Sequence, residues 1–235
     1  MRRPIVAGNW KMHGSQALLE AFAAEAFPGP VETLVFPPAV YVAEAVRRLS
    51  GIGVGIQDVH PETVGAFTGE VAAEMAAELG ATHALVGHSE RRQLFGEDNG
   101  TVAKKYAAAQ RAGLVPILCV GETLEERRAG RQEAVVLSQL HAVFGSASAR
   151  NAVVAYEPVW AIGTGETATP AQAQAMHAII REALGEPSLR ILYGGSVKPE
   201  NAAALFGEED VDGGLVGGAS LSPAAFKAIA AAAVL

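Results

Sequence analysis

The chain has 235 residues, half of them hydrophobic, which is enough for one large domain with a substantial core. Its formal net charge is −7, so it has no overall positive field to hold nucleic acid or anionic lipid, and an anionic ligand would need a local site. The only cysteine, Cys119, excludes an internal disulfide and fits a reducing cytoplasm.

The apolar stretches indicate neither export nor membrane insertion. Arg2 and Arg3 precede an apolar stretch that stops at Gly8, and no processing site follows. The longest apolar run, residues 114–120, is far shorter than a membrane-spanning helix. We therefore expect a cytoplasmic protein with no nucleic-acid partner and no membrane partner.

Eight short apolar runs with the composition of strands recur along the chain, and helical segments separate them. The predicted strands are residues 4–7, 33–36, 52–56, 83–86, 114–120, 152–156, 190–193 and 211–216. Between them, Thr123 and Thr169 each begin a capping box, Pro170 stands at a first helical position, and Ser222 precedes the last predicted helix.

This alternation of strands and helices predicts a parallel sheet, either open or closed into a barrel. Eight units in a chain of this size favour the barrel, so we expect residues 1–235 to form a single (β/α)₈ barrel domain. The carboxyl ends of its strands would share one rim, where such barrels bind ligands.

Two predicted strands are followed by polar residues that could bind a ligand or take part in a reaction. Asn9 and Lys11 follow the first strand, and an amide and an ammonium suit a carbonyl and an anion, although an exposed lysine is the commoner arrangement. His88 follows the fourth strand and precedes a predicted helical turn at residues 89–93. The partial positive charge of a helix start favours neutral imidazole, so we expect the pKa of His88 to lie below about 6.5. The alternatives are a structural histidine and a solvated ion-pair cluster at Glu90 and its neighbours.

The sixth predicted strand ends in Glu157, followed by Val159, Trp160 and Ile162. A partly desolvated carboxylate at this position is a candidate general base, since burial raises its basicity. A strand-end carboxylate bonded to backbone is the alternative. The apolar residues after it suit a flap that covers a cleft and excludes water.

Paired glycines follow the seventh and eighth predicted strands, at Gly194-Gly195-Ser196 and at Gly217-Gly218. Glycines let backbone N–H groups approach an anion closely, and the loops after strands seven and eight form a recurrent phosphate site in these barrels. Each pair alone is also compatible with a tight turn. Together they predict a phosphate-binding rim.

Other kinds of site are not supported. Residues 163–168 match a dinucleotide fingerprint, but Pro158 separates them from the strand and the helix starts later, at Thr169. We expect no metal site, because His83 and His88 lie too far apart along one strand to share an ion and paired-cysteine spacings are absent. Cys119, inside an apolar run, is expected in the core.

Seven blocks of the sequence resemble the triosephosphate isomerase family. They are residues 7–12 (AGNWKM), 65–70 (GAFTGE), 87–92 (GHSERR), 119–126 (CVGETLEE), 156–165 (YEPVWAIGTG), 193–197 (YGGSV) and 215–221 (LVGGASL). The resemblance implies Glu157 as the base and His88 as the electrophile, with Lys11 and Asn9 binding substrate and stabilising charge. A carboxylate base beside a neutral histidine, and a closing loop, are established properties of that family. The resemblance also places phosphate on backbone N–H groups around Gly163, Ser196, Gly217 and Gly218.

The family resemblance implies an activity, a partner and a cellular role. The implied reaction interconverts dihydroxyacetone phosphate and glyceraldehyde 3-phosphate without a cofactor, within glycolysis and gluconeogenesis. The implied assembly is a homodimer in which the loop from Gly65 to Glu70, with Phe67 at its centre, enters a neighbouring subunit near that subunit's Asn9 and Lys11. The rival readings are another phosphate-binding barrel isomerase and a catalytically inactive barrel that serves as a binding protein.

Two residues depart from the family pattern. His13 replaces the asparagine usual after the Lys-Met pair, at the edge of the expected site. Gly214 stands where the family usually carries a bulky apolar residue, which leaves the packing of the eighth strand as a question for the structure.

Overall fold

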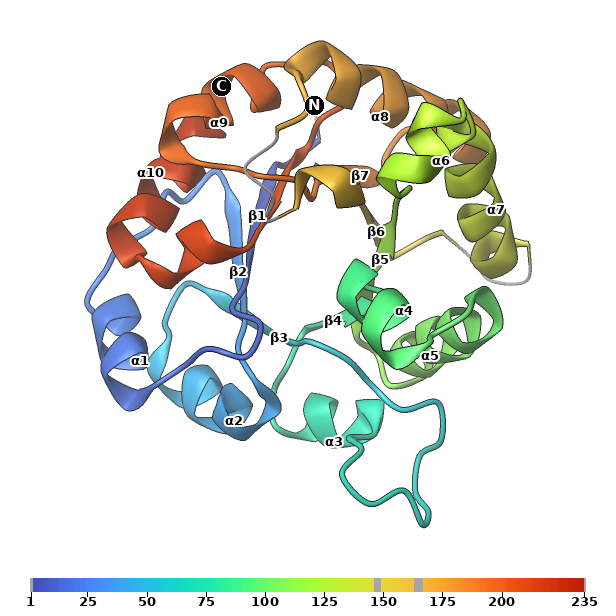
Figure 1. Ribbon diagram of the computed structural model, residues 1–235. Coiled ribbons are helices and arrows are strands. Elements are labelled where there is room, and N and C mark those ends of the chain that lie inside the picture. Colours follow the sequence, from blue (N-terminus) through green and yellow to red (C-terminus); the bar gives the residue numbers. More distant parts are fainter. Residues whose placement is uncertain (1, 146–148, 163–166, 235) are drawn as a thin grey trace.

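The computed structural model describes residues 2–145, 149–162 and 167–234. Within them, eight parallel strands form a closed barrel in sequence order, with β8 pairing back to β1 (Figure 1). The strands are β1 Ile5–Asn9, β2 Glu32–Phe36, β3 Gly53–Ile56, β4 His83–Val86, β5 Val115–Val120, β6 Val153–Tyr156, β7 Arg190–Tyr193 and β8 Gly213–Val216. The predicted (β/α)₈ barrel is confirmed. β1 runs on to Asn9, which pairs with Phe36, and β8 starts later than expected because Val211 N bonds back to Glu208 in a turn.

Helices surround the barrel on the outside (Figure 1). They are α1 Gln16–Ala23, α2 Ala39–Arg48, α3 Ala73–Glu78, α4 Ser89–Phe95, α5 Asn99–Arg111, α6 Leu124–Arg128, α7 Gln132–Phe144, α8 Pro170–Leu184, α9 Pro199–Phe206 and α10 Pro223–Ala232, with short 3₁₀ turns η1 Val159–Ala161 and η2 Gly218–Leu221. The capping boxes at Thr123 and Thr169 are present, and Ser222 caps α10. None of the helices in the described ranges is long and apolar enough to cross a membrane.

The barrel interior is filled by inward-facing side chains from seven of its strands. They are Ile5, Ala7, Leu34, Phe36, Leu85, Ile117, Cys119, Val153, Ala155, Leu192 and Leu215. On β3 the inward positions are Gly53 and Gly55, and a methyl group on Gly55 would lie 2.2 Å from the Phe36 ring. The large β2 side chains therefore occupy the space that β3 leaves. Cys119 is buried among these residues, as expected.

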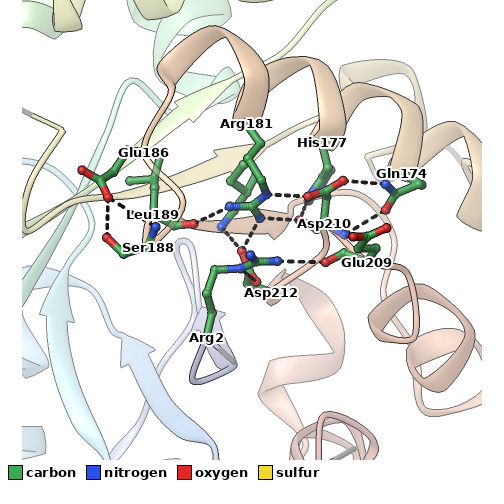
Figure 2. A network of polar contacts seen from close by, with 11 residues as sticks. Arg2, Gln174, His177, Arg181, Glu186, Ser188, Leu189, Glu209, Asp210 and Asp212 are labelled. Carbon is green, nitrogen blue, oxygen red and sulfur yellow. Dashed lines mark hydrogen bonds and ion pairs between the residues drawn. The ribbon is translucent and has the colours of Figure 1, made fainter.

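A polar network fastens the amino-terminal end of the barrel (Figure 2). Arg181 of α8 donates to the carboxylates of Asp210 and Asp212 at 2.5 and 2.8 Å, and to the Leu189 carbonyl at 2.9 Å. Asp212 also accepts from Arg2 Nε at 2.5 Å. Leu189 and Asp212 directly precede β7 and β8, and Arg2 lies three residues before the start of β1. The network therefore joins the starts of three strands at the rim opposite the predicted site.

Gly214 leaves no hole in the structure. A methyl group there would lie 3.1 and 3.2 Å from two carbons of the Phe206 ring, at the end of α9. Phe206 is 3% exposed, so its ring fills the space over β8 that a bulky residue at position 214 would take. The packing of the eighth strand is therefore restored by a side chain from the neighbouring helix.

Candidate active site

The carboxyl ends of the strands surround a cavity of about 560 Å³. All the predicted site residues that the structure describes line it, namely Asn9, Lys11, His88, Glu157, Ser196, Gly217 and Gly218. Gly163, the remaining predicted residue, lies outside the described residues. The structure thus brings together residues from the ends of five strands that are up to about 200 positions apart in the sequence.

Lys11 is presented to the cavity by a strained backbone. Its φ is +52°, a conformation that costs a non-glycine residue about 1–3 kcal/mol. Gln57, after β3, donates from Nε2 to the Lys11 and Phe36 carbonyls, each at 2.8 Å. The Lys11 N–H donates to Asn9 Oδ1 at 3.0 Å, and Lys11 Nζ lies 2.6 Å from Glu90 Oε1. These contacts hold the Lys11 ammonium in place. Because Asn9 Oδ1 accepts the Lys11 N–H, the amide nitrogen of Asn9 is the atom through which this side chain can donate to a ligand.

His88 ends the fourth βα loop and is the N-cap of α4. Its Nδ1 accepts the Glu90 N–H at 3.2 Å. Because Nδ1 accepts this bond, a neutral ring carries its proton on Nε2, which faces Glu157. The expected helical start after His88 is confirmed, and it fixes the tautomer as well as the position of the imidazole.

Glu157 lies against donors from the fourth βα loop. Its Oε1 is 3.0 Å from His88 Nε2, and its Oε2 accepts the Ser89 N–H at 2.9 Å. Glu157 is 2% exposed. Burial alone would raise the pKa of Glu157, as expected from the sequence, but His88, the Ser89 N–H and Lys11 outweigh it, so the pKa is lowered.

The pKa of His88 departs from our expectation for the same reason. Burial lowers it, but the Glu157 carboxylate outweighs burial, and the pKa of His88 is raised. The expected lowered pKa is therefore wrong for this conformation. The sequence showed the helix start beside His88 but not the carboxylate that contacts its other nitrogen.

The apolar segment after Glu157 is anchored by a buried carboxylate. Glu122, fully buried after β5, accepts from Trp160 Nε1 at 2.9 Å and from Tyr156 Oη at 3.1 Å through Oε1. Arg127 pairs with the same oxygen at 3.0 Å and stacks over the Trp160 ring at 4.8 Å. Ile162, further along, lines the cavity. The expected flap continues into residues 163–166, which lie outside the described residues.

The two glycine loops lie at the same cavity. Gly194, Gly195 and Ser196 follow β7, and Gly217 and Gly218 follow β8 at the start of η2. A methyl group on Gly195 would lie 2.2 Å from Tyr193 Oη, whereas one on Gly218 would meet nothing within 4 Å. Gly195 is therefore required by packing, while the backbone at Gly218 stays open to a ligand.

Some site residues were not singled out from the sequence. Gln57, Ser89 and Glu122 each act on a predicted residue across the rim. Each follows a strand end, and Ser89 and Glu122 also fall within two of the family-like blocks, but nothing in the sequence indicated their contacts. Glu90 and Arg92 are not merely solvated charges, since Glu90 pairs with Lys11 and Arg92 donates to the Gly87 carbonyl at 2.8 Å. His13 is exposed.

A parallel eight-stranded barrel with a buried carboxylate, a histidine and a lysine around one rim cavity is the arrangement of a barrel enzyme with groups suited to proton transfer. The chain belongs to the triosephosphate isomerase family, whose sequence pattern it matches over residues 4–233.

Full-length relatives agree with this assignment. The chain is 54% identical to the triosephosphate isomerase of Alcanivorax borkumensis over 244 aligned positions, with 99% of each chain covered. It is 55% identical to that of Stenotrophomonas maltophilia, with 99% of each chain covered. It is also 55% identical to that of Dechloromonas aromatica, covering 99% of this chain and all of the relative.

Proposed function

We propose that this protein interconverts dihydroxyacetone phosphate and D-glyceraldehyde 3-phosphate by moving one proton between neighbouring carbons. The observation that carries the proposal is the convergence of Glu157, His88, Lys11 and Asn9 on one cavity that the two glycine loops also line. Family membership supports the same reaction.

Glu157 is the proposed general base. Its carboxylate removes the proton from the carbon α to the substrate carbonyl and returns it to the neighbouring carbon. To reach that carbon it has to leave His88 and Ser89, the donors that lower its pKa. Losing these bonds inside a closed site leaves burial as the main influence, which makes the carboxylate a stronger base at the moment it is used. The proton is returned in the same cycle, so the reaction needs no cofactor.

His88, Lys11 and Asn9 are the proposed groups that stabilise the enediolate. The Nε2–H of a neutral His88 donates to the oxygen on which charge develops, because Nδ1 is occupied by the Glu90 N–H. The same ring then carries the hydroxyl proton from the oxygen of one carbon to the oxygen of its neighbour, so that the carbonyl and the hydroxyl exchange places. Lys11 Nζ and the amide nitrogen of Asn9 add a charge and a second donor. Donors fixed before the reaction stabilise developing charge without reorganisation, and the Gln57 bonds to the Lys11 backbone fix Lys11 in this way.

The phosphate group of the substrate is proposed to bind on the glycine side of the cavity. Backbone N–H groups at Ser196, Gly217 and Gly218, with Gly163 from the flap, would hold it. A flap that closes over this phosphate would also keep water away from the enediolate and suppress phosphate loss. The anchoring of Trp160 on Glu122 supports a flap that pivots at η1.

The activity is tested with purified protein and glyceraldehyde 3-phosphate in a coupled spectrophotometric assay. Turnover that is abolished in Glu157→Gln supports the proposal. Absence of turnover with triose phosphates, together with turnover of a larger sugar phosphate, would instead favour another phosphate-binding barrel isomerase. No turnover of either would favour an inactive barrel.

We also propose that the protein is a cytoplasmic homodimer acting in glycolysis and gluconeogenesis. The connection between β3 and α3 projects from the barrel (Figure 1) and carries Val64, 81% exposed, and Phe67, 43% exposed. A second cavity of about 340 Å³, lined by Lys11, Met12 and Phe95 among others, is a suitable receptor for the Gly65–Glu70 loop of another copy. Sedimentation at micromolar concentration should show a dimer, and a 24.2 kDa species alone would contradict it.

A further inference from the structure

Gln139 of α7 makes an unusual pair of hydrogen bonds with a single backbone residue. Its Oε1 accepts the N–H of Gly121 at 2.7 Å, and its Nε2 donates to the carbonyl of Gly121 at 3.0 Å. Gly121 is the first residue after β5, just beyond the last β5–β6 pair, Val120 with Tyr156. The amide therefore supplies, from a helix, the two bonds that a neighbouring strand would supply within the sheet.

Gly121 in turn lies directly against the backbone of Glu157. A methyl group on Gly121 would lie 1.7 Å from the Glu157 carbonyl oxygen and 3.2 Å from its Cα. The Glu157 N–H donates to the Val120 carbonyl at 2.7 Å. The backbone of Glu157 is thus bonded to Val120 and packed against Gly121, so a shift of Gly121 would shift Glu157.

Neither Gln139 nor Gly121 lines the large cavity with the predicted substrate-binding residues. Both line a separate cavity of about 140 Å³ that Glu157 also borders. Gln139 therefore lies outside the substrate cavity, and its bonds to Gly121 connect it with the backbone of Glu157. A displacement of a reacting group by about 1 Å can cost about 10²-fold in rate, so the position of this backbone matters for proton transfer.

We propose that Gln139 is a positioning residue for Glu157, which it acts on by clamping both polar groups of the Gly121 backbone. This inference rests on the proposed role of Glu157 as the base. The competing explanation is that Gln139 only ties α7 to the barrel. That tie would contribute to stability but would leave the rate per folded active site unchanged.

The test compares Gln139→Met, Gln139→Glu and a control, Ser138→Ala, at an exposed neighbour on the same helix. Met has similar length but makes neither bond, whereas an ionised Glu keeps an acceptor for the Gly121 N–H and places a second oxygen, which cannot donate, against the Gly121 carbonyl. Gly121→Ala keeps the Gln139 side chain and forces the Gly121 and Glu157 backbones apart, since its Cβ would lie 1.7 Å from the Glu157 carbonyl oxygen. For each variant the kcat, KM, melting temperature and inhibition constant of inorganic phosphate are measured.

We expect Gln139→Met to lower kcat by about tenfold or more, with KM and the phosphate inhibition constant within about twofold of wild type. Gln139→Glu and Gly121→Ala should also lower kcat with little change in KM, and Ser138→Ala should match wild type. A lower melting temperature with unchanged kcat in both Gln139 variants would overturn the positioning role. If wild type itself has no isomerase activity, the proposed function fails instead. If Gln139→Met does not fold, Gln139→Glu alone decides between the two explanations.

Discussion

The pairing of Phe206 with Gly214 gives a direct test of how the eighth strand is packed. Phe206→Ala removes a ring that is 3% exposed and lies over a residue with no side chain, so nothing nearby can fill the space. Truncation of a buried Phe costs about 3–5 kcal/mol. At about 2–4 °C per kcal/mol for a chain of this size, the melting temperature should fall by about 6–20 °C.

The reciprocal change, Gly214→Leu, should also lower the free energy of unfolding, but only while the Phe206 ring is present. In Gly214→Leu, Cβ would already lie 3.1 Å from the Phe206 ring, and the remaining side-chain carbons would overpack it at a cost of about 1–3 kcal/mol. In the double variant the leucine occupies the space that the ring left. We therefore expect the double variant to cost no more than about 2 kcal/mol, against a sum of about 4–8 kcal/mol for the single changes.

Denaturant unfolding of the four proteins, at one protein concentration, measures this coupling. The control pairs Gly214→Leu with Leu140→Ala, a fully buried residue of α7 on a different side of the barrel, where additive effects are expected. If the Phe206 and Gly214 changes add within about 0.5 kcal/mol, the two residues do not share one packing space and the reasoning is wrong.

Three further predictions concern the site and the pH dependence of stability. Glu157→Asp, which withdraws the carboxylate by one methylene, should lower kcat by about 10²-fold and change KM less; a near-normal kcat would mean that another residue is the base. Glu157→Gln should lower the pKa of His88 in an NMR titration of ¹⁵N-labelled imidazoles, because burial and Lys11 are then opposed only by the Glu90 carboxylate; an unchanged pKa would contradict the pairing. Burial lowers the pKa of His177 to about 4, so the unfolded chain binds this proton first and stability falls as pH drops from about 6.5 toward 4. Wild type should therefore lose about 1.5 kcal/mol more than His177→Phe between pH 6.5 and 5, and parallel stability curves would count against it. The phenylalanine leaves no orphan acceptor, since the Asp210 carbonyl also accepts from Arg181 Nη2 at 3.0 Å.

The sequence by itself determined the barrel and which strand-end residues meet at its rim cavity. Short apolar runs separated by capped helical segments are local patterns, and each is set by residues within a few positions of one another, as at Thr123 and Thr169. Once eight such units were predicted to close into a barrel, topology alone placed Asn9, His88 and Glu157 at one rim. No side-chain geometry was needed for that step.

Only the tertiary structure decided the electrostatics and the supporting contacts. The pKa of Glu157 is lowered rather than raised because its carboxylate contacts the Ser89 N–H, 68 positions away, and His88. The clamp of Gln139 on Gly121 and the filling of the Gly214 space by Phe206 likewise depend on which side chains face each other across elements. Hydrogen bonds and packing contacts act over a few ångströms in space, and a sequence pattern records separation along the chain instead, so these features became visible only when the chain was folded.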